Sequence, residues 1–191
     1  MKKIIISMLL AMAAIAATAQ PKAIGGRLGV TGLEASYEHI INGRQFIEAD
    51  LGLDFGYAGR GQAGVKLTGT YNFIWACPDW TSMGTWAIYA GPGISVGMAE
   101  DMVVYTIGDV TTGYRDHGFM LALAAQVGIE YRFDFPLQLA LDLRPCFGVH
   151  MNDGKFKDPN TGLTVEYGGK TNFYDNGMMG FIPSLSVRYC F

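Results

Sequence analysis

Long segments of this sequence alternate between apolar and polar or small residues with a period of two. From Phe119 to Phe133, one row of alternate residues is apolar throughout, and the other row carries Gln126, Glu130 and Arg132 among small residues. Successive side chains of a β-strand point to opposite faces, so the pattern predicts a strand with two chemically different sides. The chain must therefore fold around strands whose two faces meet different surroundings.

The same alternation recurs along the chain and predicts eight strands. Most are at least as long as the 9 to 11 residues that a tilted membrane strand needs. Between the first two strands we interpret Thr31-Gly32 as a tight turn, because an even strand count favours it over a bulge in one long strand. The predicted strands cover residues 22–30, 33–41, 45–57, 61–75, 84–98, 117–133, 136–150 and 177–191.

The first 19 residues have the parts of a secretory signal peptide. Lys2 and Lys3 form a basic start, the apolar run from Ile4 to Ala16 is too short to span a bilayer stably, and Ala17-Thr18-Ala19 is a cleavage site. We therefore expect a secreted protein in which residues 20–191 form one β-barrel domain.

Composition narrows the class further. Hydrophobic residues make up 50% of the chain, yet no segment after the signal peptide resembles a transmembrane helix. The chain has 17 acidic and 14 basic side chains, and two of the basic ones belong to the signal peptide. This acidic balance argues against a nucleic-acid partner.

The connections between strands differ in length. Residues 42–44 and 134–136 are short turns, whereas residues 99–116 and 151–176 are long and polar. Outer-membrane barrels have short periplasmic turns and longer external loops, so this arrangement puts both chain ends on the periplasmic side. Residues 76–83 are the exception, because they would form a rather long periplasmic turn.

Charged residues on the polar row predict what the barrel encloses. An eight-stranded barrel has an interior just wide enough for its side chains, and the small residues of this row leave room for opposed long ones. Five basic and seven acidic residues share the row, so they can pair inside. The predicted interior network consists of Arg27, Glu34, Glu38, Glu48, Asp50, Asp54, Lys66, Glu130, Arg132, Asp142, Arg144 and Arg188.

Aromatic residues on the apolar row gather at the strand ends, as they do at the two interfaces of a membrane. A soluble barrel has no reason to sort them, so we expect the apolar row to face lipid. The periplasmic girdle consists of Trp75, Trp86, Tyr131, Phe133 and Tyr189, and the opposite ends carry Phe55, Tyr57, Phe119, Phe147 and Phe181.

The chain stops on Phe191 directly after the alternating strand Leu185–Cys190. This end resembles the C-terminal insertion signal of bacterial outer-membrane barrels, and the chain after the signal peptide resembles the small barrels of the OmpA/OmpX type. The resemblance implies a closed antiparallel up-and-down transmembrane β-barrel of eight strands. It also implies outer-membrane lipid and the barrel-assembly machinery as partners, and location in the cell outer membrane, but no particular activity.

Other motifs are explained by local structure. Gly59–Gly64 fits G-x-G-x-x-G, but predicted strands flank it where a dinucleotide site needs a following helix, so we interpret it as a hairpin. Cys77, Cys146 and Cys190 have neither zinc nor redox spacing, and we interpret them as packing residues with a disulfide as the alternative. We predict no cofactor and no metal ligand.

Catalysis is the alternative that we weigh against a structural role. His150 lies near the external end of a strand, where a lipid A deacylase would carry a histidine, but the neighbouring serine of such enzymes is absent. We therefore predict no catalytic residue and a non-enzymatic barrel with a plugged polar interior, which acts in envelope structure or in surface interaction through residues 99–116 and 151–176. The alternatives are an outer-leaflet lipid-modifying enzyme and a soluble periplasmic ligand-binding barrel. Residues 101–107 could extend a strand and offer Val103 and Tyr105 to a partner.

Overall fold

The computed structural model describes residues 22–55, 63–107, 110–152, 154–157, 164–166, 168–169, 171–175 and 180–191. The expected signal peptide at residues 1–19, Tyr57 and most of the motif at 59–64 lie outside the described residues. In the described part the fold is all-β. No helix in this part of the chain is long and apolar enough to cross a membrane.

Twelve strands follow one another along the chain. They are β1 (Lys22–Leu28), β2 (Gly32–Asn42), β3 (Gln45–Asp54), β4 (Gly64–Ala76), β5 (Gly84–Ile107), β6 (Val110–Phe133), β7 (Leu137–Leu143), β8 (Cys146–Asn152), β9 (Lys155–Lys157), β10 (Thr164–Glu166), β11 (Thr171–Asp175) and β12 (Ser184–Cys190).

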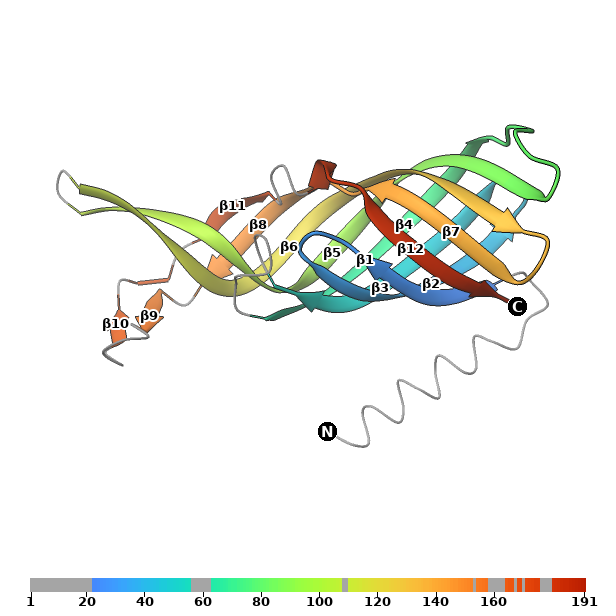
Figure 1. Ribbon diagram of the computed structural model, residues 1–191. Coiled ribbons are helices and arrows are strands. Elements are labelled where there is room, and N and C mark those ends of the chain that lie inside the picture. The colour runs from blue at the N-terminus through green and yellow to red at the C-terminus, as the bar shows by residue number, and fades with distance from the viewer. Residues whose placement is uncertain are drawn as a thin grey trace.

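Eight of these strands close into an antiparallel barrel, which confirms the predicted closed, eight-stranded antiparallel β-barrel. Strands β1 to β7 pair in chain order, and β12 closes the ring between β7 and β1. Figure 1 shows both described ends of the chain at the same end of the barrel. There Lys22 and Phe191 exchange two backbone hydrogen bonds of 3.0 and 2.8 Å.

The first connection is a tight turn, as predicted, and not a bulge. The Gly29 amide donates a hydrogen bond of 3.0 Å to the Gly32 carbonyl, and β1 pairs with β2 from Leu28 and Leu33 onward. The Thr31 carbonyl accepts a hydrogen bond of 2.7 Å from the Phe55 amide. This turn is therefore tied to the end of β3.

The strand predicted at 136–150 is interrupted, and within the described residues 180–191 the strand predicted at 177–191 begins late, which corrects both predictions. Strands β7 and β8 are separated at Arg144-Pro145, and β12 begins only at Ser184 after Pro183. Proline has no amide to donate to a ladder, so each one ends regular pairing at its position. Strand β8 continues the line of β7 along β6, and β11 pairs with β8.

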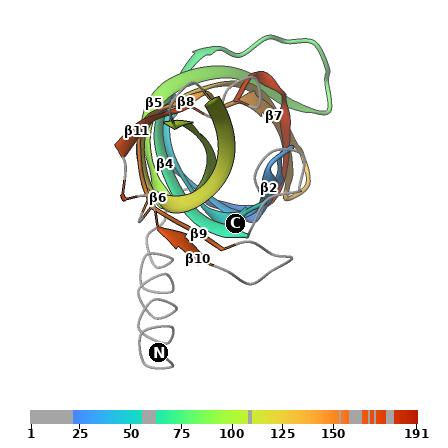
Figure 2. The ribbon, with the colours of Figure 1, turned by 90° about the vertical axis from the view of Figure 1, so that its left-hand side faces the viewer.

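The segment predicted as a long loop at 99–116 is instead a hairpin that continues β5 and β6, and the prediction that residues 101–107 extend a strand is confirmed. Pairing runs without interruption to Ile107 and Val110. Val103 to Ile107 is rich in β-branched and aromatic residues, which favours strand over loop. Figure 1 shows this hairpin extending beyond the barrel at the end opposite Lys22 and Phe191, and Figure 2 shows it in front of the barrel opening.

The segment predicted as a loop at 151–176 also contains strands. Strands β9 and β10 form a separate two-stranded sheet, and β11 joins the wall beside β8. The loop prediction is therefore wrong for these strands, although the segment does project from the same end of the barrel as the β5–β6 hairpin (Figure 1).

Candidate functional site

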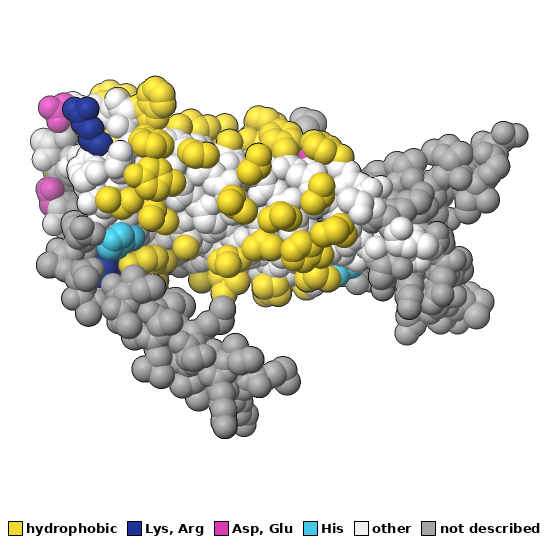
Figure 3. Space-filling model, turned by 180° about the vertical axis from the view of Figure 1, so that it is seen from behind, with side chains coloured by type: hydrophobic (Ala, Val, Ile, Leu, Met, Phe, Trp, Pro, Cys, Tyr) yellow, Lys and Arg dark blue, Asp and Glu magenta, His cyan; other side chains and the backbone are white. Residues whose placement is uncertain are grey.

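The two faces of the barrel wall have the reverse of the polarity found in a water-soluble protein. On β2, Glu34 and Glu38 point inward and are 6% and 0% exposed, whereas Leu33, the residue directly before Glu34, is 56% exposed. The same inversion holds on the other strands of the ring, where leucine, isoleucine and valine are among the most exposed side chains. Figure 3 shows hydrophobic side chains spread around the middle of the barrel, with charged ones at the surface of the end that carries the termini.

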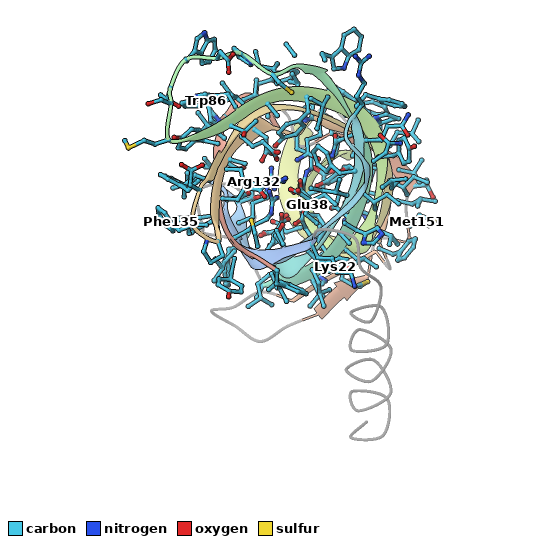
Figure 4. The ribbon with its side chains drawn as sticks, turned by 90° about the vertical axis from the view of Figure 1, so that its right-hand side faces the viewer. Lys22, Glu38, Trp86, Arg132, Phe135 and Met151 are labelled. Carbon is cyan, nitrogen blue, oxygen red and sulfur yellow. The ribbon has the colours of Figure 1, made fainter. Side chains whose placement is uncertain are left out.

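The structure places all twelve charged residues of the predicted interior network inside the barrel. Ten of them are buried, while the side chain of Lys66 is 11% exposed and that of Arg132 is 33% exposed. Figure 4, seen from the end with the termini, shows Glu38 and Arg132 inside the ring and Trp86 and Phe135 outside it. Ion pairs connect the twelve side chains into one continuous set.

Two arginines form the centre of this network. Arg144 pairs with Glu48 at 2.9 Å and also contacts Asp50. Arg188 pairs with Glu48 at 2.7 Å and with Glu38 at 3.2 Å. Glu48 therefore lies between two guanidinium groups, an arrangement that compensates a carboxylate removed from water.

The outer part of the network, near the β1–β2 turn, combines two cations with three carboxylates. Arg27 pairs with Glu34 at 2.8 Å and with Asp142 at 2.6 Å, which joins β1 to β2 and β7. Lys66 pairs with Asp54 at 2.8 Å and lies 3.8 Å from Glu34. Glu34 thus forms ion pairs with both of these cations, and it also pairs with Arg144 at 3.2 Å.

The part of the network near Lys22 and Phe191 contains the side-chain amide of Gln138 between the carboxylates of Glu38 and Glu130. Arg132 pairs with Glu38 at 3.2 Å and with Glu130 at 3.5 Å. The Gln138 side-chain amide donates to the same two carboxylates, at 2.7 and 2.8 Å. Sequence reasoning missed Gln138, although its position on the polar row of β7 was a usable signal.

Two aromatic side chains, Tyr89 and Phe46, also fill the interior beside the predicted charges. Tyr89 is fully buried, and its ring meets that of Phe46 edge-on at 5.0 Å. Gly128 makes room for them, because a Cβ there would lie 2.6 Å from the Tyr89 hydroxyl oxygen. Phe46 is apolar, but it is two residues before Glu48 on β3 and therefore lies on the same inward face. Its position in the alternation, and not its hydrophobicity, predicts that it is inside.

The predicted aromatic girdle lies at the end with the termini. Ring centroids of Trp86 and Tyr131, and of Tyr131 and Phe133, are each 4.6 Å apart. The long turn at 76–83 adds to this cluster, since Trp80 lies 5.4 Å from Trp86. Trp75 and Tyr189 belong to the same end and are 76% and 57% exposed.

The hydroxyl of Thr81 connects this turn to the girdle. It accepts a hydrogen bond of 3.1 Å from the Trp86 indole and donates one of 3.2 Å to the Tyr131 hydroxyl. The turn is therefore fixed to the outer surface of the wall. At the opposite strand ends, Phe119, Phe147 and Phe181 are exposed and Phe55 is half-buried.

His150, the residue of the enzymatic alternative, lies inside the barrel and is fully buried. Its Nε2 is 3.0 Å from the Ala99 carbonyl oxygen, and its ring stacks with that of Tyr174 at 6.4 Å. Its Nδ1 has no hydrogen-bond partner within the described part of the chain. Ala99, Met120 and Tyr174 form a buried apolar cluster at this level, so the surroundings of His150 are those of a packed core.

The three cysteines form no disulfide with one another. Cys77 is exposed in the turn after β4, Cys146 is buried, and Cys190 is half-buried. Among the described residues, no three or more His, Cys, Asp or Glu side chains are grouped so that they could hold a metal ion.

Comparison of the sequence with protein-family models and with curated proteins, and of the structure with solved structures, found no match. The arrangement of side chains on the barrel itself is therefore the basis for a functional conclusion.

Proposed function

We propose that this protein is a non-enzymatic β-barrel of a bacterial outer membrane, with a plugged polar interior and a role in envelope structure or surface interaction. The observation that carries the proposal is the inverted polarity of the wall. A ring of strands that exposes leucine and isoleucine and buries charge is unfavourable in water. The same ring is favourable in the hydrocarbon core of a membrane. The aromatic cluster at the end with the termini supports the same proposal, because such rings favour a membrane interface.

The interior supports a plug and not an open channel. Arg188, Glu38, Glu48, Gln138 and Tyr89 are all at most 1% exposed, so side chains fill the cross-section at the middle of the barrel. An eight-stranded barrel has little lumen beyond the space of its own side chains. We therefore expect no ion conduction through it.

The β5–β6 hairpin is the part that we propose for surface interaction. Strand β4 pairs with β5 as far as Met98, and β8 pairs with β6 as far as Gly118. Between these two residues and the tip of the hairpin, neither outer edge has a neighbouring strand among the described residues. An unpaired edge offers a row of backbone donors and acceptors to an extended segment of a partner protein. Val103 and Tyr105 lie on the β5 edge, and charged residues there should abolish capture of a surface partner.

A comparison of unboiled and boiled samples on a gel tests the membrane assignment. The protein is extracted with detergent from the membrane fraction, and we expect the unboiled form to migrate differently from the boiled form. A protein that stays soluble without detergent and shows no shift would contradict the proposal and favour a soluble ligand-binding barrel.

A second experiment tests the non-enzymatic assignment. Because His150 is packed against Ala99 and Tyr174, we expect a His150→Ala strain to keep an unchanged lipid A profile in mass spectra of extracted lipid. A changed profile would favour the lipid-modifying enzyme.

A further inference from the structure

A row of five aromatic rings crosses the outer wall at the end of the barrel that carries Lys22 and Phe191. The row begins in the turn at 76–83, passes over β5 and β6, and ends in the turn before β7. Consecutive ring centroids lie 5.4, 4.6, 4.6 and 4.8 Å apart. We call this row the aromatic shelf, and it consists of Trp80, Trp86, Tyr131, Phe133 and Phe135.

The turn at 76–83 lies beside the wall and not over the opening of the barrel. Figures 2 and 4, which view the barrel from its two ends, both show the connection between β4 and β5 outside the ring. The Thr81 hydroxyl holds the turn there through its hydrogen bonds with Trp86 and Tyr131. Trp80 of the turn is 60% exposed, so the shelf presents ring surface to whatever surrounds the barrel at this level.

The exposed charge on this surface is negative. Asp79 directly precedes the first ring of the shelf, and Asp134 lies between its last two rings; both side chains are exposed. Residues 76–90 and 128–136 are all described by the structure, and their single basic residue is Arg132, which points into the barrel. A ligand that fits the shelf therefore carries a positive charge.

The head group of a phospholipid that contains an ammonium group matches this surface. Cations are attracted to the faces of tryptophan and tyrosine rings and to carboxylates. Because the Tyr131 hydroxyl accepts the hydrogen bond from Thr81, its own proton is available to a phosphate oxygen. Next to the shelf, the outer face of β6 is apolar, with Val127 47% and Leu123 70% exposed. Each part of such a lipid therefore meets a suitable part of the wall.

We propose that the aromatic shelf binds the head group of an ammonium phospholipid whose acyl chains lie along the outer face of β5 and β6. The inference rests on the proposed membrane location and adds the class of lipid that this end of the barrel prefers. The ammonium group lies against the ring faces near the two carboxylates, and the phosphate accepts a hydrogen bond from Tyr131. A purely anionic phospholipid lacks the group that the carboxylates and ring faces attract.

Native mass spectrometry of the folded protein in a neutral detergent tests the proposal. The probe is dioleoyl phosphatidylethanolamine, and its matched control is dioleoyl phosphatidylethanol, which has the same chains and phosphate diester but no ammonium group. We expect the probe to bind about five-fold more strongly than the control, because cation–π contacts and exposed ion pairs each contribute a small factor.

Variants of exposed residues locate the site. Trp80→Leu keeps an apolar side chain but removes a ring, and Asp79→Asn and Asp134→Asn each remove a charge, so all three should bring the binding of the two lipids closer to equal. Thr81→Val should act in the same direction, because it removes both hydrogen bonds that hold the turn. Trp75→Leu is the control: Trp75 is 76% exposed at the same end of the barrel but lies on β4, outside the shelf, and its replacement should leave the preference unchanged.

The outcomes separate this inference from the proposed function. A barrel that shows the gel shift but binds both lipids equally, or binds phosphatidylethanol more strongly, overturns the head-group site alone. A preference that persists when Trp80→Leu is combined with Asp79→Asn and Asp134→Asn also overturns it, since the ammonium group would then be bound elsewhere. A protein that is soluble without detergent overturns both the head-group site and the membrane assignment.

Discussion

Arg188 is the side chain whose removal tests the interior network most directly. It is 1% exposed, and its guanidinium pairs with Glu38 and Glu48, two carboxylates that are themselves fully buried. Its Nε also donates a hydrogen bond of 2.9 Å to the Ser36 hydroxyl. Arg188→Met keeps an unbranched side chain in the interior but removes the charge and every one of these hydrogen bonds.

The expected loss follows from what remains around the two acids. Removing one partner of a buried ion pair costs about 3–5 kcal/mol, because the other charge stays in a medium of low polarity. After the substitution, Glu48 still pairs with Arg144 at 2.9 Å and Glu38 with Arg132 at 3.2 Å. We therefore expect Arg188→Met to lower the free energy of unfolding by about 3 kcal/mol, at the lower end of that range.

Arg132→Met is the matched control. Its side chain is 33% exposed, so water screens its pairs with Glu38 and Glu130, and exposed pairs contribute about 0–1 kcal/mol. The assay is equilibrium urea unfolding of the protein folded into lipid vesicles, followed by gel mobility without boiling. Equal losses in the two variants, or a loss below about 1 kcal/mol for Arg188→Met, would refute the view of a dry, charge-paired interior.

Three further predictions concern packing, the outer face and topology. Gly128→Val should lower the free energy of unfolding by about 1–3 kcal/mol in the same urea assay, because its side chain would meet Tyr89 and Asp142, whereas Gly69→Ala, with open space around it, should have no effect. Leu123, which is 70% exposed, tests the outer face: Leu123→Arg should lower the free energy of unfolding in vesicles by about 2–4 kcal/mol if this face contacts lipid. An unchanged stability would place the face in water, and Gly43→Arg in the turn after β2 is the control. Cys77 is exposed and Cys146 is buried. A maleimide that cannot cross the outer membrane should therefore leave Cys77 unlabelled in intact cells, and after the membrane is permeabilised it should label Cys77 but not Cys146. Labelling of Cys77 in intact cells would reverse the assignment of the two ends.

The sequence pattern was sufficient for the parts of the fold that depend on strand parity. Glu48 and Leu51 differ by an odd number of positions on β3, and the structure puts the first inside and the second on the outer face. Parity could not give the partners of each charge, because those depend on how far neighbouring strands are shifted along one another.

The regions where prediction failed are those without a two-faced environment. Residues 99–107 pair as a strand beyond the barrel; the polar composition of 99–116 favoured a loop, although residues 101–107 also suggested a strand extension. The break at Arg144-Pro145 arises because proline has no amide to donate, and the alternation continues on either side of it, so the pattern did not indicate the break.

The position of Arg188 in the last strand has a consequence for the order of assembly. Its partners Glu38 and Glu48 belong to β2 and β3, which are synthesised and can pair as a hairpin long before β12 exists. Arg27 likewise waits for Asp142, 115 residues further along the chain. Until the final strand docks, these carboxylates must keep their water, so an unclosed sheet cannot dehydrate its inner face. The interior therefore loses its water in the same cooperative step in which β12 docks. This step is the slow step of folding, because it forms contacts between residues far apart in the sequence.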